Sequence, residues 1–163
     1  MLRIADMNDL EVLVELFIEE NHHNHKLAPD VVARTEDVLS TSKPQEIMDD
    51  ENTYLYVCES DGDVTGLLLG NIVYIKAKRW SQARRFAGIE ELIVTERARG
   101  KGFAKALVSQ FEAWAKVKGA RSIELHVWTN NDIAINFYET SGYLGKQLLM
   151  SKPVQTPANL NTG

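Results

Sequence analysis

Residues 88–107 constrain this chain more than any other stretch, because a strand, a glycine turn and a helix follow one another there without a gap. Gly88–Val94 is a short apolar run with β-branched residues and two carboxylates, which predicts a strand. A polar break over 95–99 leads into Arg99-Gly100-Lys101-Gly102, which has two glycines and two cations, and a helical apolar pattern comes next. The first N–H groups of a helix lack partners within it, and glycines let nearby N–H groups curl around an anion. The stretch therefore predicts a phosphate-binding turn.

Two well-known phosphate loops do not fit this turn. No G-x-x-x-x-G-K-[ST] run occurs in the chain, and a dinucleotide G-x-G-x-x-G/A pattern fails because its third small residue would be Lys105. What remains is R-x-x-G-x-A, filled by Arg99, Gly102 and Ala104. This pattern resembles the acyl-CoA pyrophosphate loop of the GNAT superfamily of N-acyltransferases.

A second motif strengthens the resemblance. The run Asn131-x-x-Ala134-Ile135-x-Phe137-Tyr138-Glu139-x-x-Gly142-Tyr143 matches the family's N-x-x-A-I-x-F-Y-E-x-x-G-F/Y signature. One predicted helix and one predicted strand separate it from the glycine turn, as in the family. Two departures are small: Ala104 replaces a commoner glycine, and Thr95-Glu96 stands where many members have a proline. The N-terminal half carries no sub-family signature.

Composition limits the class of protein. A chain of 163 residues with 44% hydrophobic and 25% charged residues is typical of one globular domain. No apolar run is long enough to span a membrane, and the first residues lack the features of a signal peptide. The single cysteine, Cys58, excludes an internal disulfide and is expected to be a buried small residue. We therefore expect a cytoplasmic protein, and the net charge of −5 disfavours nucleic acid as a partner.

The order of the predicted elements, with the resemblance, implies an α+β fold. We expect an α/β/α sandwich, in which a mixed, mainly antiparallel twisted sheet has helices on both faces. One domain over residues 1–152 is followed by a loose tail, 153–163. Strands are predicted at 2–5, 53–59, 64–75, 88–94, 122–128 and within 142–152. Helices are predicted after Asp6 or Asn8, within 30–50, from Phe103 to Lys118, and at 133–140.

Three local features of the sequence lead to further predictions. Gly66 and Gly70 within a long strand predict a bulge or a close backbone approach, and Asp61-Gly62 predicts a hairpin turn. Residues 76–86 are basic and are expected to form a solvated loop near the cofactor phosphates. A polar patch from Glu19 to Lys26 contains three histidines. A solvated helix end is the favoured interpretation, while a metal site and an acidic wall of Glu19 and Glu20 for a cationic substrate stay open.

The resemblance implies transfer of an acetyl group from acetyl-CoA to a primary amine. An ammonium with a pKa near ~10 must lose a proton before it can attack, so a base is needed. Glu90 and Glu91 are neighbours on the predicted strand and should point to opposite faces. Diamine acetyltransferases of the superfamily carry a glutamate where Glu90 stands, so we expect Glu90 as base, Glu91 second and His126 third. Tyr138 matches the family's acid for the departing thiolate.

The resemblance also implies how the cofactor and acceptor bind. The backbone of Leu92, Ile93 and Val94 is expected to hold the pantetheine arm, and Asn131 to contact it. The pyrophosphate is expected on the turn and first helical residues: Arg99, Gly100, Lys101, Gly102, Phe103, Ala104 and Lys105.

No metal is required for this chemistry. A small cationic amine, polyamine or aminoglycoside-like, is the favoured acceptor. The alternatives are a protein N-terminus or lysine, or a non-catalytic acyl-CoA-binding module. We expect no membrane partner, and a homodimer is possible because dimers are common in the family.

Overall fold

The computed structural model describes residues 1–39 and 44–155. Contacts divide the chain into two compact units, Met1–Asn131 and Asp132–Gly163, and each is described by itself. Part of the predicted break at Ser42–Pro44 and most of the predicted loose tail lie outside the described residues.

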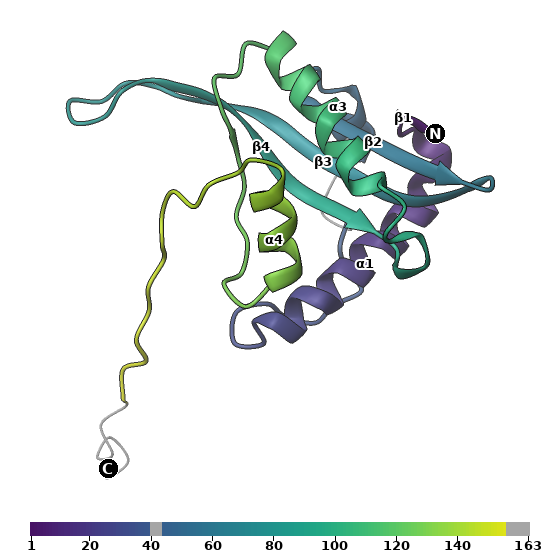
Figure 1. The fold of residues 1–163 in the computed structure, drawn as a ribbon, viewed down its shortest axis with the longest axis horizontal. Coiled ribbons are helices and arrows are strands. Elements are labelled where there is room, and N and C mark those ends of the chain that lie inside the picture. The colour runs from purple at the N-terminus through teal and green to yellow at the C-terminus, as the bar shows by residue number, and fades with distance from the viewer. Residues whose placement is uncertain (40–43, 156–163) are drawn as a thin grey trace. The chain divides into compact units, whose positions relative to one another are not determined.

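The first unit is built on a five-stranded sheet in the order β1-β2-β3-β4-β5 (Figure 1). The strands are β1 (Leu2–Ile4), β2 (Thr53–Ser60), β3 (Asp63–Ile75), β4 (Arg84–Val94) and β5 (Ile123–Glu124). The first four pair antiparallel, whereas β4 and β5 pair parallel. The predicted mixed, mainly antiparallel sheet is therefore confirmed.

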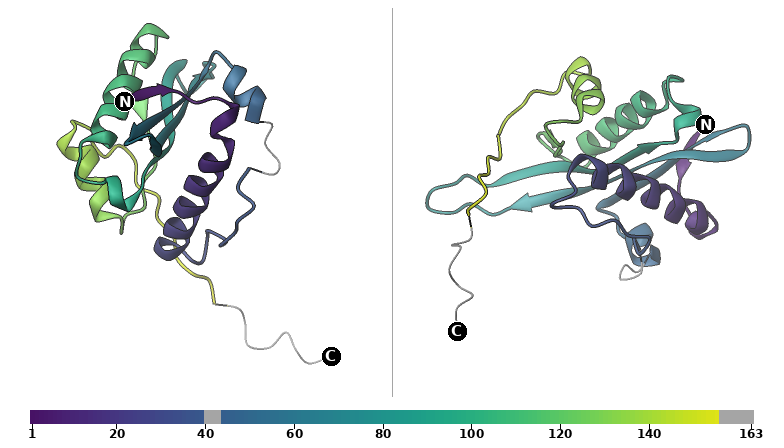
Figure 2. Two further views of the ribbon diagram at one scale, coloured as in Figure 1. Left: turned by 90° about the vertical axis from the view of Figure 1, so that its right-hand side faces the viewer. Right: turned by 90° about the horizontal axis from the view of Figure 1, so that it is seen from below.

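Helices cover both faces of this sheet, as predicted (Figure 2). The helices α1 (Leu10–Leu27) and α2 (Pro44–Asp49) lie on one face, and α3 (Phe103–Val117) lies on the other. Leu13 of α1 is buried with Val57 and Leu67 of the sheet. On the opposite face the ring of Phe111 meets the ring of Tyr54 edge-on, with centroids 5.2 Å apart. Each face is thus sealed by its own apolar core.

The start of α1 is fixed to the sheet by ion pairs. Arg3 of β1 pairs with Asp9 at 2.8 Å and with Glu59 of β2 at 2.7 Å. Asp6 caps the short 3₁₀ turn η1 (Met7–Asp9) that leads into α1. These contacts set the direction in which α1 crosses the sheet, and therefore where its later residues lie.

The predicted turns and close approaches in β2 and β3 are confirmed. Asp61 and Gly62 have φ values of 56° and 85°, which a tight hairpin turn requires. A Cβ at Gly70 would lie 2.5 Å from the ring of Phe111, and one at Gly66 would lie 2.5 Å from the carbonyl oxygen of Ile93. The pairing with β4 also shifts register between Leu69 and Gly70, which marks a β-bulge.

The β4 strand begins earlier than predicted, and this moves the basic loop. Cross-strand pairing continues to Tyr74↔Arg85 and Ile75↔Arg84, so β3 and β4 form a ribbon that extends past the sheet (Figure 1). The basic loop lies at the tip of this ribbon, at the start of β4, whereas the glycine turn follows the end of β4. The basic loop and the glycine turn, to which the sequence assigns the phosphates, therefore lie at opposite ends of β4.

Two other segments are less regular than predicted. The strand expected at 122–128 is reduced to Ile123–Glu124, because the chain leaves β4 after only two paired residues. The helix expected within 30–50 is the six-residue α2. Residues 28–39 form turns instead. A hydrogen bond of 2.7 Å between a ring nitrogen of His25 and the Val32 carbonyl oxygen holds this segment.

The second unit contains α4 (Asp132–Thr140), as predicted, and the chain turns at Gly142 with φ 92°. The strands predicted within 142–152 are absent from this described segment. Leu144 and Leu149 are 90% and 91% exposed, so the apolar side chains of the segment have no buried face that would hold it as a strand. None of the helices in residues 1–39 and 44–155 has the length and apolarity of a membrane span.

Candidate active site

The β4 strand has an open edge beside its last residues. Its pairing with β5 involves only Ala87 and Gly88. The Thr95 N–H donates to the Thr65 carbonyl at 2.9 Å. Because backbone groups alternate sides along an antiparallel strand, those of Leu92 and Val94 face away from β3. Within the described residues no strand covers this edge, so an extended amide-bearing chain can pair with it.

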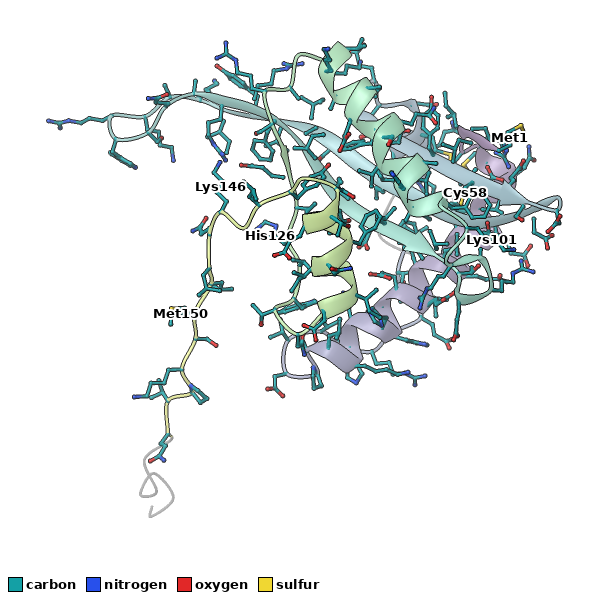
Figure 3. The ribbon with its side chains drawn as sticks, in the orientation of Figure 1. Met1, Cys58, Lys101, His126, Lys146 and Met150 are labelled. Carbon is teal, nitrogen blue, oxygen red and sulfur yellow. The ribbon has the colours of Figure 1, made fainter. Side chains whose placement is uncertain are left out.

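The glycine turn has the geometry of an anion site. After the 3₁₀ turn η2 (Glu96–Ala98), Gly100 and Gly102 take φ values of 74° and 84°. A Cβ at either glycine would meet nothing within 4 Å, so the turn is open to solvent. Gly102 is the N-cap of α3 and supplies no side-chain bond to it, and Lys101 projects from the same turn (Figure 3). These residues fit a pyrophosphate, as the sequence predicts.

Arg99 lies between the strand and the turn. Its Nε donates to the carbonyl oxygen of Val94 at 3.1 Å. Burial raises the pKa of Glu20 on α1, and the hydrogen bond from Asn24 and then the charge of Arg99 partly oppose this rise. The Arg99 guanidinium therefore lies near the open edge and close to an acidic side chain of α1.

The bulge separates the environments of the two strand glutamates. Leu69 pairs with Glu91 and Gly70 pairs with Ile89, so Glu90 is the extra residue. Glu90 is exposed, whereas Glu91 is half-buried. Burial, and then the negative charges of Glu20 and Glu90, raise the pKa of Glu91 to about 7. Glu91 is thus the carboxylate whose pKa lies near neutral pH.

Glu20 is a candidate site residue. The sequence indicated it only together with Glu19, as part of a possible acidic wall. Glu19 is exposed, whereas Glu20 is half-buried and acts on Glu91. The helical period distinguishes them, because Glu20 follows the inward-facing Phe17 by three residues. Counting from the apolar face of the helix could therefore have selected Glu20.

Other candidate residues lie apart from this carboxylate pair. His126 is exposed and follows the end of β5, so it is not a core histidine. Cys58 is fully buried, as predicted, and burial raises the pKa of its thiol. Among the described residues no group of histidine, cysteine or acidic side chains is arranged to hold a metal ion.

The second motif spans the two units. In the first unit, the Asn131 N–H donates to the Trp128 carbonyl at 2.9 Å, and the Asn130 side chain donates to the Leu27 carbonyl at 2.8 Å. The Asn130 bond ties the turn that precedes residue 132 to the end of α1. In the second unit, the ring of Tyr138 contacts the rings of Phe137 and Tyr143, with centroids 5.1 Å and 5.4 Å apart.

Three features occur together in this structure: a mixed sheet that opens after Gly88, a free strand edge, and a glycine turn before a helix. Together they define the class of acyl-CoA-binding folds. The chain belongs to the acetyltransferase (GNAT) family, whose model matches residues 11–143. It is 32% identical over 94 residues to the uncharacterized N-acetyltransferase MJ1207 of Methanocaldococcus jannaschii; this match covers 58% of the chain and 40% of that relative. The chain thus spans less than half of the curated relative's length.

Solved structures share the fold. A mutant of the BH1408 protein from Bacillus halodurans superposes with a TM-score of 0.89 at 23% identity, covering 95% of this chain and 99% of that one. The aminoglycoside N-acetyltransferase AAC(6')-Iy, solved with CoA, gives a TM-score of 0.69 at 15% identity and covers 96% and 100%. The predicted family and fold class are confirmed, and the predicted acetyl-CoA co-substrate agrees with the family assignment.

Proposed function

We propose that this protein transfers the acetyl group of acetyl-CoA to a primary amine, with Glu91 as the base. One observation carries the proposal: Glu91 is half-buried on β4, beside the strand's open edge, with a pKa of about 7. A base with this pKa is ionised often enough near neutral pH to accept a proton and basic enough to take it from an ammonium. Glu90, the base expected from the family pattern, is exposed and lacks this support.

The reaction balances with two residues of the chain. Glu91 removes a proton from the ammonium, directly or through water, and the amine nitrogen attacks the thioester carbonyl carbon. The C–N bond forms and the C–S bond breaks, so that CoA leaves as a thiolate. Tyr138 donates its phenolic proton to this thiolate, and the acetylated nitrogen releases its extra proton to solvent. The Tyr138 phenolate then takes up a proton from solvent and Glu91 releases its proton to solvent, which restores both residues. The family motif supports this role for Tyr138.

The cofactor is proposed to lie along the open edge of β4. The outward-facing backbone groups of Leu92 and Val94 would pair with the amides of the pantetheine arm, with Ile93 between them facing β3. Asn131 is proposed to contact this arm. The turn from Arg99 to Lys105 would hold the pyrophosphate, because its glycines expose N–H groups and Lys101 and Lys105 add positive charge.

The acceptor is proposed to be a small cationic amine. Glu20 and Glu91 present two carboxylates on the α1 face of the sheet, next to the open edge. An ammonium placed between them would be attracted electrostatically and would lie within reach of the base. Polyamines and aminoglycosides belong to this class of acceptor, and a peptide amine is the alternative.

A CoA-release assay tests the proposal. Free thiol is measured with acetyl-CoA alone and then with a panel of amines, for the wild type, Glu91→Gln and Glu90→Gln. We expect amine-dependent CoA release that falls about 10²- to 10⁴-fold in Glu91→Gln and much less in Glu90→Gln. Equal turnover of wild type and Glu91→Gln would remove Glu91 as the base. Binding of acetyl-CoA without release by any amine would indicate a non-catalytic module.

A further inference from the structure

The far end of the β3–β4 ribbon takes no part in the site described above. This ribbon tip, residues 74–85, is exposed throughout its length and runs on past the sheet (Figure 2). The segment beside β4 stays with it as far as Arg85, whose carbonyl oxygen accepts from the Arg121 N–H at 3.0 Å. Beyond this point β3 and β4 are the only strands of the described structure in the ribbon. The ribbon tip is therefore accessible from both faces.

A tight turn gives the ribbon tip a defined end. The Lys78 N–H donates to the Ser81 carbonyl at 2.9 Å, and the Ser81 N–H donates to the Lys78 carbonyl at 3.2 Å. These two bonds make Arg79 and Trp80 the central residues of a two-residue hairpin turn. Trp80 is 82% exposed and Tyr74, on β3, is 59% exposed. The turn thus holds an indole ring in solvent at the end of the ribbon.

The charge of the ribbon tip is opposite in sign to that of the whole chain. The tip contains five basic residues and no acidic one, whereas the chain has a net charge of −5. Arg84 forms an ion pair with Glu124 at 2.7 Å. In the part of the chain that the structure describes, no ion pair joins Lys76, Lys78 or Arg79 to a carboxylate. These three cations are therefore available to a negatively charged partner.

An exposed indole among cations fits the surface of an anionic membrane. Tryptophan and tyrosine favour the boundary between lipid headgroups and acyl chains, and lysine and arginine are attracted to anionic headgroups. Ile75, 37% exposed, adds an aliphatic side chain that suits this boundary. Nucleic acid also attracts cations, but single strands bind to several aromatic rings along a basic groove. The hairpin turn offers one ring, so a membrane is the better match.

The length of the ribbon tip keeps the acidic remainder of its unit away from such a surface. Arg85 and Trp80 are five residues apart, which corresponds to roughly 15 Å of extended strand. The Debye length at physiological salt is only about 8 Å. Negative charges behind Arg85 are therefore largely screened from a membrane that the turn touches.

We propose that the ribbon tip docks this protein on an anionic membrane surface. Trp80 lies among the lipid headgroups, and Lys76, Lys78 and Arg79 lie beside the lipid phosphates and carboxylates. An apolar anchor and a basic patch, each weak alone, together give reversible binding. The contact needs no spanning helix, and the lack of a spanning apolar run in the sequence does not argue against it. It is independent of the acetyltransferase proposal, because the glycine turn follows the opposite end of β4.

Vesicle sedimentation tests the proposal. The protein is mixed with vesicles of phosphatidylcholine alone, or of phosphatidylcholine and phosphatidylserine in equal parts. We expect binding to the mixed vesicles that weakens as salt rises, and far less binding to the neutral ones. Equal sedimentation with both kinds of vesicle, or none with either, would overturn the proposal.

Two matched pairs of variants locate the contact. Lys78→Gln should weaken binding to mixed vesicles about fivefold, and Trp80→Ser about tenfold or more. Lys116→Gln and Val117→Ser remove an exposed cation and an exposed apolar side chain from α3, and should leave binding unchanged. Thermal unfolding of all four variants shows whether each is folded. Equal losses in the tip variants and the α3 variants would contradict docking through the tip.

A fluorescent single-stranded DNA distinguishes the other class of anionic partner. We expect the wild type to bind this DNA more weakly than it binds the mixed vesicles at the same salt concentration. Binding to the DNA that is lost in Trp80→Ser, without binding to vesicles, would overturn the membrane proposal and assign the ribbon tip to nucleic acid.

Discussion

Glu20 of α1 places its negative charge near Glu91 of β4, on the face of the sheet that α1 covers. Burial contributes most to the raised pKa of Glu91, and the charges of Glu20 and Glu90 add to it. The helix thus supplies part of the electrostatic setting of a strand residue. Because Glu20 acts on the pKa of Glu91, changing Glu20 and changing Glu91 should have different effects on the pH dependence of turnover.

The first prediction concerns the pH profile of turnover. If Glu91 is the base, kcat/KM rises with pH up to about 7, where Glu91 becomes ionised, and then levels. Glu20→Gln removes a negative charge that raises the pKa of Glu91, so it should shift this limb to lower pH. Glu15→Gln, an exposed change on the same helix, is the control. Equal shifts in both variants, or none, would contradict the relationship.

The second prediction concerns stability. The folded-state pKa of Glu91 is raised above that of an ordinary glutamate, so the folded state binds its proton more tightly than the unfolded state does. Stability from this residue is therefore present at low pH and is lost as pH rises through about 7. Glu91→Gln should raise the free energy of unfolding by about 1–3 kcal/mol at pH ~8 and leave it nearly unchanged near pH ~4.

Urea denaturation at the two pH values measures this difference. A gain of the same size at both would assign the effect to packing rather than to charge. A loss at the higher pH would show that the ionised carboxylate stabilises the fold. The same variant is expected to lose turnover, so stability and activity should move in opposite directions.

The third prediction concerns the proposed acid. Tyr138→Phe keeps the ring and removes the phenolic proton, so turnover should fall about a hundredfold or more while acetyl-CoA still binds. Tyr143→Phe removes a phenol from a ring that contacts Tyr138 and should retain turnover. Steady-state CoA release and a thermal shift with acetyl-CoA separate the two effects. Unchanged turnover in Tyr138→Phe would remove its proposed role.

The fourth prediction concerns packing between β3 and α3. A Cβ at Gly70 would lie 2.5 Å from the ring of Phe111 and 2.7 Å from the Gly88 carbonyl oxygen. Gly70→Ala should therefore destabilise the fold by about 1–3 kcal/mol, because both neighbours must shift. Gly145→Ala, where the added methyl meets nothing within 4 Å, should change stability far less. Chemical denaturation of both variants checks this, and equal effects would contradict the packing account.

Local patterns predicted much of the fold. The alternation in β2, the Asp61-Gly62 turn and the helical periods of α1 and α3 each depend on neighbours in the sequence, and each was predicted. The two glycines of β3 could also be interpreted from the local sequence, because a strand glycine indicates a bulge or a close backbone approach.

The segments that differ depend on contacts that a local pattern cannot contain. The extension of β4 to Arg84 rests on pairing with β3 and on an ion pair between Arg84 and Glu124 at 2.7 Å. The early end of β5 depends on where the chain leaves β4, although residues 122–128 have a strand composition. The segment from Leu144 to Met150 forms no strand in the described structure, so composition alone predicted strands there wrongly.

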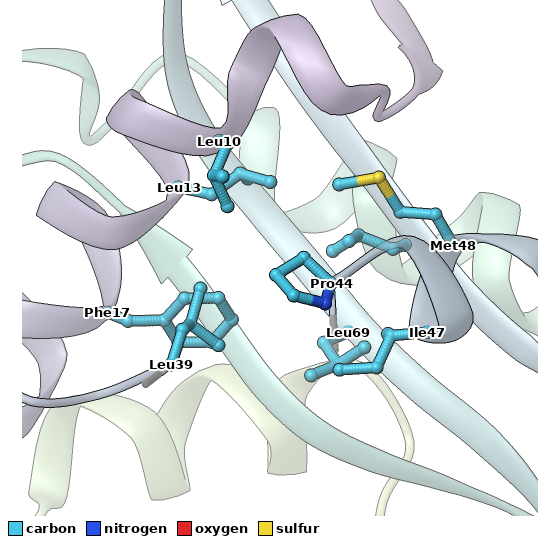
Figure 4. A pocket seen from close by; sticks show the side chains of 9 residues that line it. Leu10, Leu13, Phe17, Leu39, Pro44, Ile47, Met48 and Leu69 are labelled. Atoms are coloured by element: carbon cyan, nitrogen blue, oxygen red, sulfur yellow. The ribbon is translucent and has the colours of Figure 1, made fainter. Parts of the chain in front are cut away.

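Some features of the candidate site could likewise be predicted from the local sequence, and others could not. The glycine turn and the strand carboxylates could be found from motifs. The distinction between Glu90 and Glu91 could not, because the bulge between Leu69 and Gly70 decides which glutamate is half-buried. A small apolar hollow between α1, α2 and β3 (Figure 4) also brings together residues from distant parts of the chain.

We propose that the turn from Arg99 to Lys105 binds the pyrophosphate of acetyl-CoA. Gly102→Asp and Gly62→Asp are a matched pair, because both glycines have open surroundings and φ values of 84° and 85°. The two substitutions therefore cost similar backbone strain, but only Gly102→Asp places a negative charge in the proposed anion site.

A thermal-shift titration with acetyl-CoA on the wild type and these two variants tests this pyrophosphate site. At a hundredfold excess over Kd, bound ligand should stabilise the folded protein by about 2.7 kcal/mol. We predict this stabilisation for the wild type and Gly62→Asp, and its loss in Gly102→Asp. Equal stabilisation of all three proteins would contradict the assigned pyrophosphate site, and no stabilisation of the wild type would contradict acetyl-CoA as the co-substrate.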